Sequence, residues 1–223
     1  MKTFIICLSK ITTSLNTATQ LQSKLLELGM ESELFEGTYG DQATEMMEEE
    51  GRTLHPVGVK GEIDPHDEKI RKLMSPGVRG CFYSHYRLWQ KCVELNEPII
   101  IFEDDIVVRR SFLETDWKEV LIVAIGHPTK SERYMHLLEQ PYGDPRAEEC
   151  KLSSMPGCCG YAIKPHAAQK LLDIYNKTFL PADNAINRNV MTMQIHSHLM
   201  GIALTKKDGK KSLTKYGAWG EDA

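Results

Sequence analysis

Four consecutive large apolar residues, Ile99 to Phe102, constrain the fold of this chain more than any other feature. Side chains of a strand alternate between its two faces, so a strand without a polar position must be covered on both of them. That environment is typical of a central strand in a parallel sheet with helices packed on either side. The run therefore predicts a layered α/β fold.

The first 35 residues agree with this arrangement. Residues 2–8 read as an apolar strand, and residues 18–28 then place alanine and leucine residues on one helical face that ends at Gly29. A short strand fits residues 31–35. Strand, helix and strand in this order are typical of an α/β protein.

Further elements are expected along the rest of the chain. Hydrophobic spacing predicts helices over 82–95, 165–176 and 184–192, and strands over 120–125, 160–163 and 201–204. Residues 41–79 read as a helix fragment with a long loop, and residues 126–156 as irregular. Together these elements predict one domain over residues 1–205, followed by a Lys-rich, flexible tail over 206–223.

Composition excludes several classes of protein. The 223 residues include six cysteines without a C-x-x-C pair, which argues against a zinc ribbon or a secreted disulfide framework. No apolar run reaches the roughly 18 residues of a membrane span, so we expect a cytoplasmic protein without integral membrane association. The net charge of −4 argues against non-specific nucleic-acid binding.

Three acidic residues, Glu103, Asp104 and Asp105, directly follow the buried strand. In open α/β sheets, ligands bind beyond the carboxyl ends of the strands. Adjacent carboxylates in a partly dry site repel one another unless a cation compensates them, and oxygen ligands favour Mg²⁺ or Mn²⁺. Because Mg²⁺ is commonly shared with substrate phosphates, the pattern predicts a phosphorylated ligand. Solvated turns, calcium sites and phosphatases share the same pattern.

A longer motif resembles a known family. Residues 80–85 read Gly-Cys-Phe-Tyr-Ser-His, Trp89 follows, and residues 99–105 read Ile-Ile-Ile-Phe-Glu-Asp-Asp. This order and spacing resemble glycosyltransferase family 25, which includes bacterial lipooligosaccharide galactosyltransferases and collagen galactosyltransferases. Residues 116–117 (Asp-Trp) and 157–163 (Gly-Cys-Cys-Gly-Tyr-Ala-Ile) add to the resemblance, which is strongest over 76–106.

The resemblance implies a GT-A type fold, a single nucleotide-binding domain with a central, mostly parallel sheet flanked by helices. It also implies a UDP-sugar donor, Mn²⁺ or Mg²⁺, and inversion of the anomeric centre. Glu103 and Asp105 look like the metal carboxylates, with Glu103 and Asp104 also on the donor nucleotide. Ser84 and His85 look like donor-site residues, and Lys10 stands where the family often has an arginine.

Two further residues are assigned through the resemblance. Asp183 looks like the acidic residue near the acceptor and is our candidate catalytic base, with Glu139 as a second candidate; the alternative for Asp183 is the N-cap of the following helix. GT-A enzymes often complete the metal shell with a C-terminal histidine, so His198 is expected as a metal ligand. His196 is its alternative.

The predicted function is a metal-dependent, inverting transfer of a sugar from a UDP-sugar to an acceptor hydroxyl. The acceptor is a glycan, a protein or a hydroxymethylated DNA base; in the last case the lysines of 206–215 would face phosphate. The alternatives are a non-catalytic module that binds nucleotide-sugars and a metal-dependent phosphohydrolase.

Overall fold

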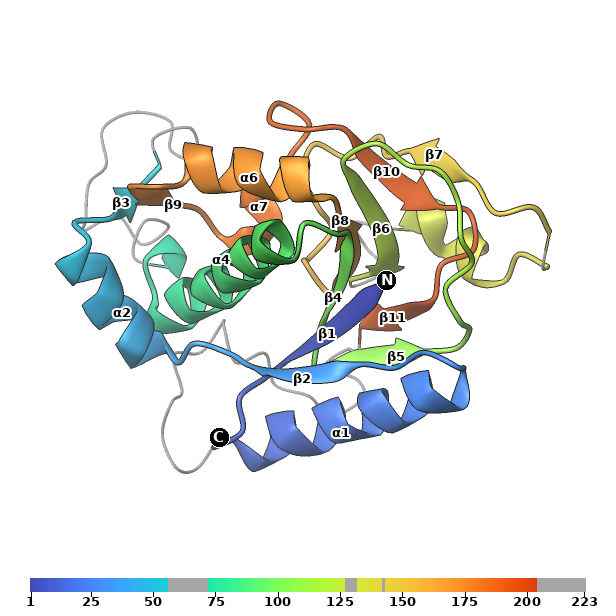
Figure 1. Cartoon of the computed structure of the whole chain (residues 1–223), viewed down its shortest axis with the longest axis horizontal. Helices are drawn as coiled ribbons and strands as arrows, with labels where there is room; N and C mark the ends of the chain where they lie inside the picture. The colour runs from blue at the N-terminus through green and yellow to red at the C-terminus, as the bar shows by residue number, and fades with distance from the viewer. Residues whose placement is uncertain (56–71, 127–131, 142, 204–223) are drawn as a thin grey trace.

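The computed structural model describes residues 1–55, 72–126, 132–141 and 143–203 (Figure 1). The Lys-rich tail over 206–223, and much of the long loop expected before residue 79, lie outside these ranges. Within the described residues, no helix combines the length and the apolar character that crossing a membrane requires.

The centre of the molecule is a mixed sheet. Its strands lie in the order β2 (Glu33–Glu36), β1 (Lys2–Cys7), β4 (Ile99–Glu103), β8 (Gly160–Ile163), β6 (Val120–Ile125), β10 (Met193–His196) and β7 (Ala147–Glu149). A further strand, β11 (Gly201–Ala203), pairs with β6 and with β5 (Ile106–Val108). The strands β1, β2, β4, β6, β10 and β11 all point the same way, whereas β5, β7 and β8 run against them.

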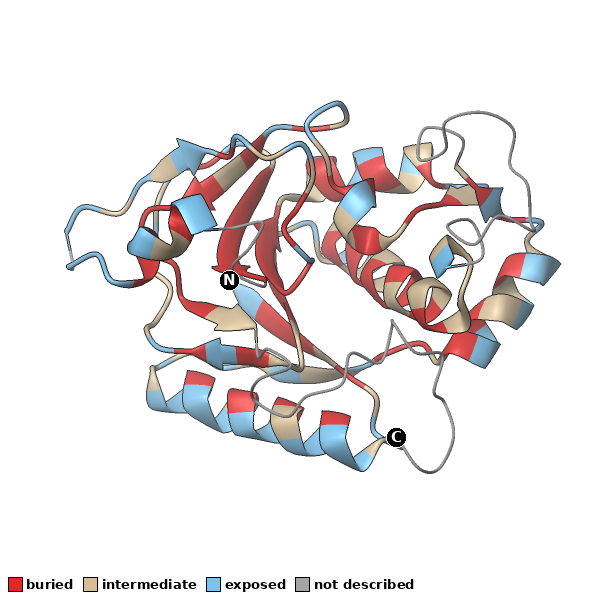
Figure 2. Cartoon of the chain, turned by 180° about the vertical axis from the view of Figure 1, so that it is seen from behind, coloured by how far each residue is buried: buried red, intermediate tan, exposed pale blue. Residues whose placement is uncertain are grey.

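Helices cover both faces of this sheet (Figure 1). One face carries α1 (Thr12–Glu27), and the other carries α4 (Pro76–Leu95), α6 (Pro165–Ile174), α2 (Gly40–Glu49) and the short α7 (Ala182–Ala185). Figure 2 shows buried residues concentrated on the sheet and on the helix faces turned toward it. The expected α/β fold, with helices flanking a central and mostly parallel sheet, is confirmed.

The strand β4 shows why the sequence folds this way. Ile99 and Ile101 are buried in the core beneath α4 and α6, while Ile100 and Phe102 are buried in the core beneath α1. The alternation places the next residue, Glu103, on the α4 face of the sheet. An apolar run that is covered on both faces thus ends in a carboxylate that faces one particular helix.

Several boundaries differ from the expected ones. The helix α4 begins at Pro76, earlier than residue 82, because proline suits the first turn of a helix. The helix expected over 184–192 is wrong: α7 ends at Ala185, and Asn187 forms an isolated bridge with Ser154 instead. The stretch expected to be irregular contains the 3-10 helix η2 (Glu132–Leu138) and β7, and the two-residue strands β3 (Thr53–Leu54) and β9 (Thr178–Phe179) pair with each other.

Candidate functional site

The carboxyl ends of three neighbouring strands meet at one edge of the sheet. Ile6, near the end of β1, lies opposite Phe35 of β2 and Glu103 of β4. The loops that follow these strands therefore leave the sheet side by side. Gly160 starts the antiparallel strand β8 at the same edge, opposite Phe102. The predicted carboxylates stand where an α/β sheet is expected to bind its ligand.

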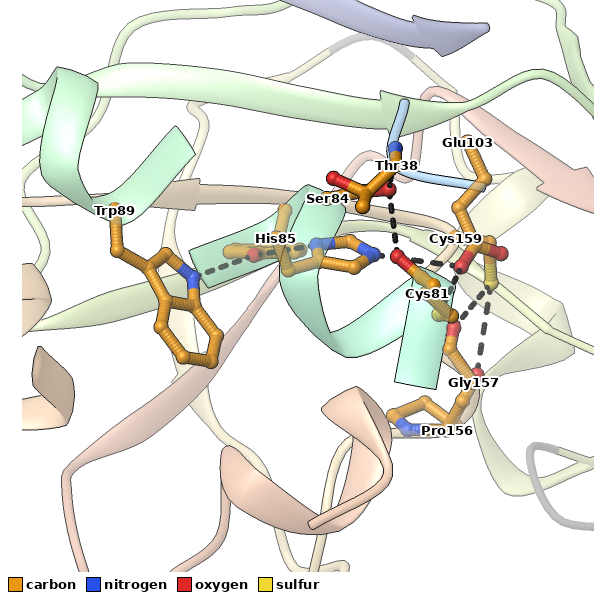
Figure 3. A network of polar contacts seen from close by, with 11 residues as sticks. Thr38, Cys81, Ser84, His85, Trp89, Glu103, Pro156, Gly157 and Cys159 are labelled. Atoms are coloured by element: carbon orange, nitrogen blue, oxygen red, sulfur yellow. Dashed lines mark hydrogen bonds and ion pairs between the residues drawn. The ribbon is translucent and has the colours of Figure 1, made fainter. Parts of the chain in front are cut away.

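Glu103 is held at this edge by two residues of α4 (Figure 3). Cys81 Sγ lies 3.6 Å and His85 Nε2 lies 3.4 Å from Glu103 Oε1. Cys81 and His85 are four residues apart, so they project from the same face of the helix. Both contacts fall on Oε1, and the Glu103 side chain keeps 30% of its surface exposed.

The acidic residues lie around the buried thiols. Burial, and then the negative charges of Glu103, Asp183 and Asp105, raise the pKa of Cys81 well above its ordinary value. Cys81 therefore stays protonated and can donate its hydrogen to Glu103. The pKa of Cys159 is raised by burial and by the same three carboxylates. The structure thus gathers Glu103, Asp105 and Asp183 from distant parts of the sequence around one cluster of thiols.

The segment before β8 packs tightly against the ends of β4 and β6. Cys159 O accepts the N–H of Glu103 at 3.0 Å, and Pro156 O accepts the N–H of Gly126 at 3.0 Å. A Cβ atom at Gly160 would lie 2.7 Å from Ala124 Cβ and 2.8 Å from the Phe102 ring. Glycine is therefore needed at position 160 for the sheet to close next to Glu103.

The charge of Asp104 acts on a different thiol. Burial raises the pKa of Cys7, at the end of β1, and the negative charges of Asp104 and Glu36 raise it further. The charges of Glu103 and Asp105 thus act on Cys81 and Cys159, whereas that of Asp104 acts on Cys7. The predicted role of Asp104 on the donor nucleotide stays a prediction.

Ser84 uses its hydroxyl inside the protein. Ser84 Oγ donates to Gly80 O at 2.7 Å and accepts the N–H of Thr38 at 2.8 Å, and the residue is buried (Figure 3). The hydroxyl therefore ties the loop after β2 to α4. A Cβ atom at Gly80 would lie 2.6 Å from Thr38 O, so these two segments touch closely. In this geometry Ser84 supports the wall of the site, and direct contact with a donor stays a prediction.

Lys10 lies in the loop after β1, at the same edge. Its side chain is exposed, and its ammonium group lies 5.3 Å from the centre of the Tyr39 ring. The Lys10 N–H donates to Tyr39 Oη at 2.8 Å. Tyr39 precedes α2, so Lys10 stands beside the start of that helix. A cation at this position can reach an anionic ligand, and its role on the donor stays a prediction.

Asp183 is not the N-cap of a helix, so the N-cap role that was the alternative prediction for this residue is wrong. Pro181 occupies the N-cap position of α7, and Asp183 is the second residue of the helix. Its side chain is half-buried, and its charge acts on Cys81, Cys158 and Cys159. The other candidate base, Glu139, is exposed beyond η2.

His198 is engaged by the chain around it. Its Nε2 lies 3.0 Å from Pro141 O and accepts the N–H of Gly143 at 3.2 Å, while its Nδ1 lies 3.1 Å from Ser197 Oγ. Coordination of a metal ion would require at least one of these contacts to break. The prediction that His198 is a metal ligand stays untested by this geometry.

His196 is held in the same way. Its Nδ1 accepts the N–H of His198 at 2.9 Å, and its Nε2 lies 2.8 Å from Leu113 O. The strand β10 pairs with the first half of β6 and β11 with its second half, and Met200 donates to Val123 between them. The segment 196–198 therefore lies beside the middle of β6 and not beyond its carboxyl end.

Three side chains of the kinds that bind metal ions lie close together at this edge. In the described part of the chain, the ligand atoms of Cys81, His85 and Glu103 all lie within 4.8 Å of one another. Glu103 and Asp105 add hard carboxylate oxygens, the ligand type that Mg²⁺ and Mn²⁺ prefer, whereas a thiol and an imidazole suit softer ions. The chemistry of these carboxylates therefore suits a divalent cation.

Sequence reasoning missed one residue of this site. Tyr161 of β8 lies with its hydroxyl oxygen 2.9 Å from His85 Nδ1 and 2.9 Å from Trp89 Nε1. Its ring stacks on that of His85, with the ring centres 5.7 Å apart. Tyr161 belongs to the Gly-Cys-Cys-Gly-Tyr segment, so the motif contained it, but nothing local in the sequence joins it to His85.

A cavity of about 500 Å³ lies at the opposite edge of the sheet, beside the amino ends of β6 and β10. Among its lining residues, Lys170 pairs with Glu119 at 3.4 Å and Arg188 pairs with Glu149 at 3.0 Å. These cations already have acidic partners, and the predicted carboxylates do not line this cavity. We therefore keep the carboxyl edge as the candidate site.

The chain is similar to known proteins of one family. A family model described as glycosyltransferase family 25 (LPS biosynthesis protein) matches residues 1–186. The lipooligosaccharide biosynthesis protein lex-1 of Haemophilus influenzae is 28% identical over 136 residues, which are 54% of this chain and 43% of that protein. A glycosyltransferase 25 family member of Aedes aegypti is 37% identical over 84 residues, which are 36% of this chain and 12% of that protein.

The matched segments thus span less than half the length of either curated relative. Among solved structures, apo mouse xyloside xylosyltransferase 1 is 12% identical, and the match covers 82% of this chain and 66% of that one. Its TM-score is 0.28.

Proposed function

The chain belongs to glycosyltransferase family 25, and from this premise we propose that it transfers a sugar from a UDP-sugar to an acceptor hydroxyl. The observation that carries the proposal is the position of Glu103. It ends a fully buried strand at the carboxyl edge of the sheet, with Asp105 and Asp183 around the same thiols. This arrangement offers one place where a charged donor and an acceptor can meet.

We propose that a divalent cation, Mn²⁺ or Mg²⁺, belongs to the site. Glu103 and Asp105 would hold it through carboxylate oxygens. Bound there, the cation would neutralise the negative charge that develops on the departing diphosphate. Lys10, exposed in the adjacent loop, would add a positive charge for the same anion.

Asp183 is proposed as the base that takes the proton from the acceptor hydroxyl. The residue is half-buried, and its charge acts on the same thiols as those of Glu103 and Asp105. Inversion needs the acceptor to approach the anomeric carbon from the side away from the diphosphate, so the base and the metal carboxylates must be separate groups. A carboxylate near the anomeric carbon also stabilises positive charge that develops there.

A glycan is the acceptor that we propose first, because the matching lex-1 protein of Haemophilus influenzae is named for lipooligosaccharide biosynthesis. A protein hydroxyl and a hydroxymethylated DNA base are the competing acceptors. Binding to DNA would weaken steeply as salt is added, since counterions are released from phosphate. A glycan acceptor would show little dependence on salt.

Thermal unfolding with a panel of UDP-sugars tests the proposal. A ligand that binds only the folded state raises the melting temperature, so the correct donor should raise it with Mn²⁺ and less without it. Release of UDP should then accelerate when the acceptor is added. Binding without release would show a non-catalytic module, and release of phosphate from a simple ester would show a phosphohydrolase.

A further inference from the structure

A line of polar contacts runs from the core to Glu103. Trp89 Nε1 lies 2.9 Å from Tyr161 Oη, Tyr161 Oη lies 2.9 Å from His85 Nδ1, and His85 Nε2 lies 3.4 Å from Glu103 Oε1. Figure 3 shows Trp89 at one end of this network and Glu103 at the other, with His85 between them. The side chains of Trp89, Tyr161 and His85 are all fully buried.

The donor and acceptor properties of these groups favour one placement of the hydrogens. An indole N–H can only donate, so Trp89 donates to the oxygen of Tyr161. Burial raises the pKa of Tyr161 well above its ordinary value, so the phenol keeps its own hydrogen. Of the two contacts of that oxygen, only His85 Nδ1 can accept this hydrogen. A neutral imidazole that accepts at Nδ1 carries its hydrogen at Nε2, which points at Glu103.

The opposite assignment leaves a buried donor unsatisfied. If His85 bound a metal ion through Nε2, its hydrogen would sit on Nδ1 and would point at Tyr161. Two donors, Trp89 and His85, would then face one phenol oxygen, and the Tyr161 hydrogen would lack an acceptor in these contacts. Buried polar groups are almost always hydrogen-bonded, so the first assignment is favoured.

We propose that Trp89 and Tyr161 are positioning residues that hold His85 as the Nε2–H tautomer, and that His85 thereby holds Glu103 in its ligand-binding orientation. The proposal rests on the proposed function for the role of Glu103. Cys81 and His85 both donate to Oε1 of Glu103, which turns the other oxygen, Oε2, to the ligand. His85 is then a support for the metal carboxylate and not a metal ligand.

Such a support has a measurable effect. Partners that orient a metal-binding side chain typically change metal affinity by about 10-fold to 100-fold when they are removed. The Tyr161→Phe variant removes the hydroxyl that imposes the tautomer and keeps the ring that stacks on His85. We expect its half-saturating Mn²⁺ concentration to rise about 10-fold, with a smaller change in kcat.

Tyr175→Phe is the matched control. Tyr175 is buried, its hydroxyl lies 3.2 Å from Ala185 O, and its ring packs on Phe82 of α4. Both variants therefore lose one buried hydroxyl near the same helix, but only Tyr161 contacts His85. A similar loss of thermal stability in both, with a changed Mn²⁺ requirement in Tyr161→Phe alone, separates positioning from a general loss of structure.

The tautomer itself can be read without any turnover. Long-range ¹⁵N–¹H correlation spectra of the labelled full chain, in alkaline buffer where histidine rings are neutral, distinguish a protonated ring nitrogen from an unprotonated one. The His85 signals are assigned by their absence in His85→Asn. We expect Nε2–H in the wild type and in Tyr175→Phe, and a loss of this single tautomer in Tyr161→Phe.

Each result decides between the two proposals. A wild-type His85 that carries its hydrogen on Nδ1, or a tautomer unchanged in Tyr161→Phe, would overturn the positioning role whatever the activity is. If the protein shows the expected tautomer but neither binds Mn²⁺ nor turns over any UDP-sugar, the hydrogen bonds from Trp89 to Glu103 are supported and the proposed function is rejected. An equal rise in the Mn²⁺ requirement of both Tyr→Phe variants would also reject the positioning role.

Discussion

Two regions of this molecule contain fully or almost fully buried histidines, and their partners differ. His85 is contacted by side chains, Tyr161 at one ring nitrogen and Glu103 at the other. His196 and His198 are contacted mainly by the polypeptide backbone, and each holds a loop in place. Burial is the same in both regions, so burial alone does not indicate a functional histidine.

The difference lies in where each region stands on the sheet. His85 projects from α4 toward the carboxyl end of β4, where three strands end together. His196 and His198 lie beside the middle of β6, where the chain passes from β10 to β11. A histidine whose outer nitrogen faces a carboxylate at the ligand-binding edge can influence the chemistry. One that satisfies backbone groups stabilises the fold.

The largest expected effect is a loss of kcat on substitution of Asp183, which belongs to the same region as His85. Asp183→Asn removes the proposed base and keeps the shape of the side chain, so kcat should fall by about 10²-fold to 10⁴-fold. The melting temperature should change little. Asp173→Asn, at an exposed position of α6 away from the thiols, is the control and should retain activity. Full activity in Asp183→Asn would remove the base from this account.

The next effect compares the two regions directly. His85→Asn keeps a polar group near Tyr161 but cannot reach Glu103, so the catalytic efficiency should fall by about 10-fold to 100-fold. His198→Asn leaves buried backbone groups without a partner and should lower the free energy of unfolding by about 1–3 kcal/mol. Steady-state kinetics of both variants measures the catalytic efficiency, and urea unfolding measures the free energy of unfolding.

The comparison would be wrong if His198→Asn lost activity and His85→Asn lost only stability. A folded His198→Asn protein that lost its Mn²⁺ dependence would make His198 a metal ligand, as the sequence resemblance suggested. In that case His85 would be the structural histidine. We expect the Mn²⁺ dependence of folded His198→Asn to match that of the wild type.

The smallest effect is a pH dependence of stability on the His196 side. Burial lowers the pKa of His196 below its ordinary value of 6.5, so the unfolded chain binds this proton more readily than the folded one. The stabilisation from keeping the ring neutral is complete above about pH 6.5 and is lost as the pH falls below it. The unfolding free energy of the wild type should therefore decrease more steeply below pH 6.5 than that of His196→Gln. Parallel curves for the two proteins would contradict this.

Part of the site could be predicted because the signal is local. An apolar run that ends in Glu103, Asp104 and Asp105 specifies both a strand covered on two faces and the acidic group at its end. The spacing of Cys81 and His85 on a helix also places them on one face. These features depend on the alternation of a strand and the turn of a helix, which sequence alone reveals.

The rest depends on which strands become neighbours. Tyr161 reaches His85 only because β8 runs antiparallel beside β4, and no local pattern specifies that pairing. The contacts of His196 with Leu113 and of His198 with Pro141 likewise join distant parts of the chain and could not be predicted, while metal coordination by His198 stays a prediction. The helix expected over 184–192 failed for the same reason, since Asn187 pairs with Ser154 across the fold.

The most direct test of the account is the double variant Glu103→Ala with Asp105→Ala. We predict that it folds, loses UDP-sugar turnover by about 10³-fold or more, and no longer responds to Mn²⁺. The control removes two exposed carboxylates from β7, Glu148→Ala with Glu149→Ala, and should keep both properties. Turnover and manganese dependence that survive in the Glu103 and Asp105 double variant would contradict the central claim.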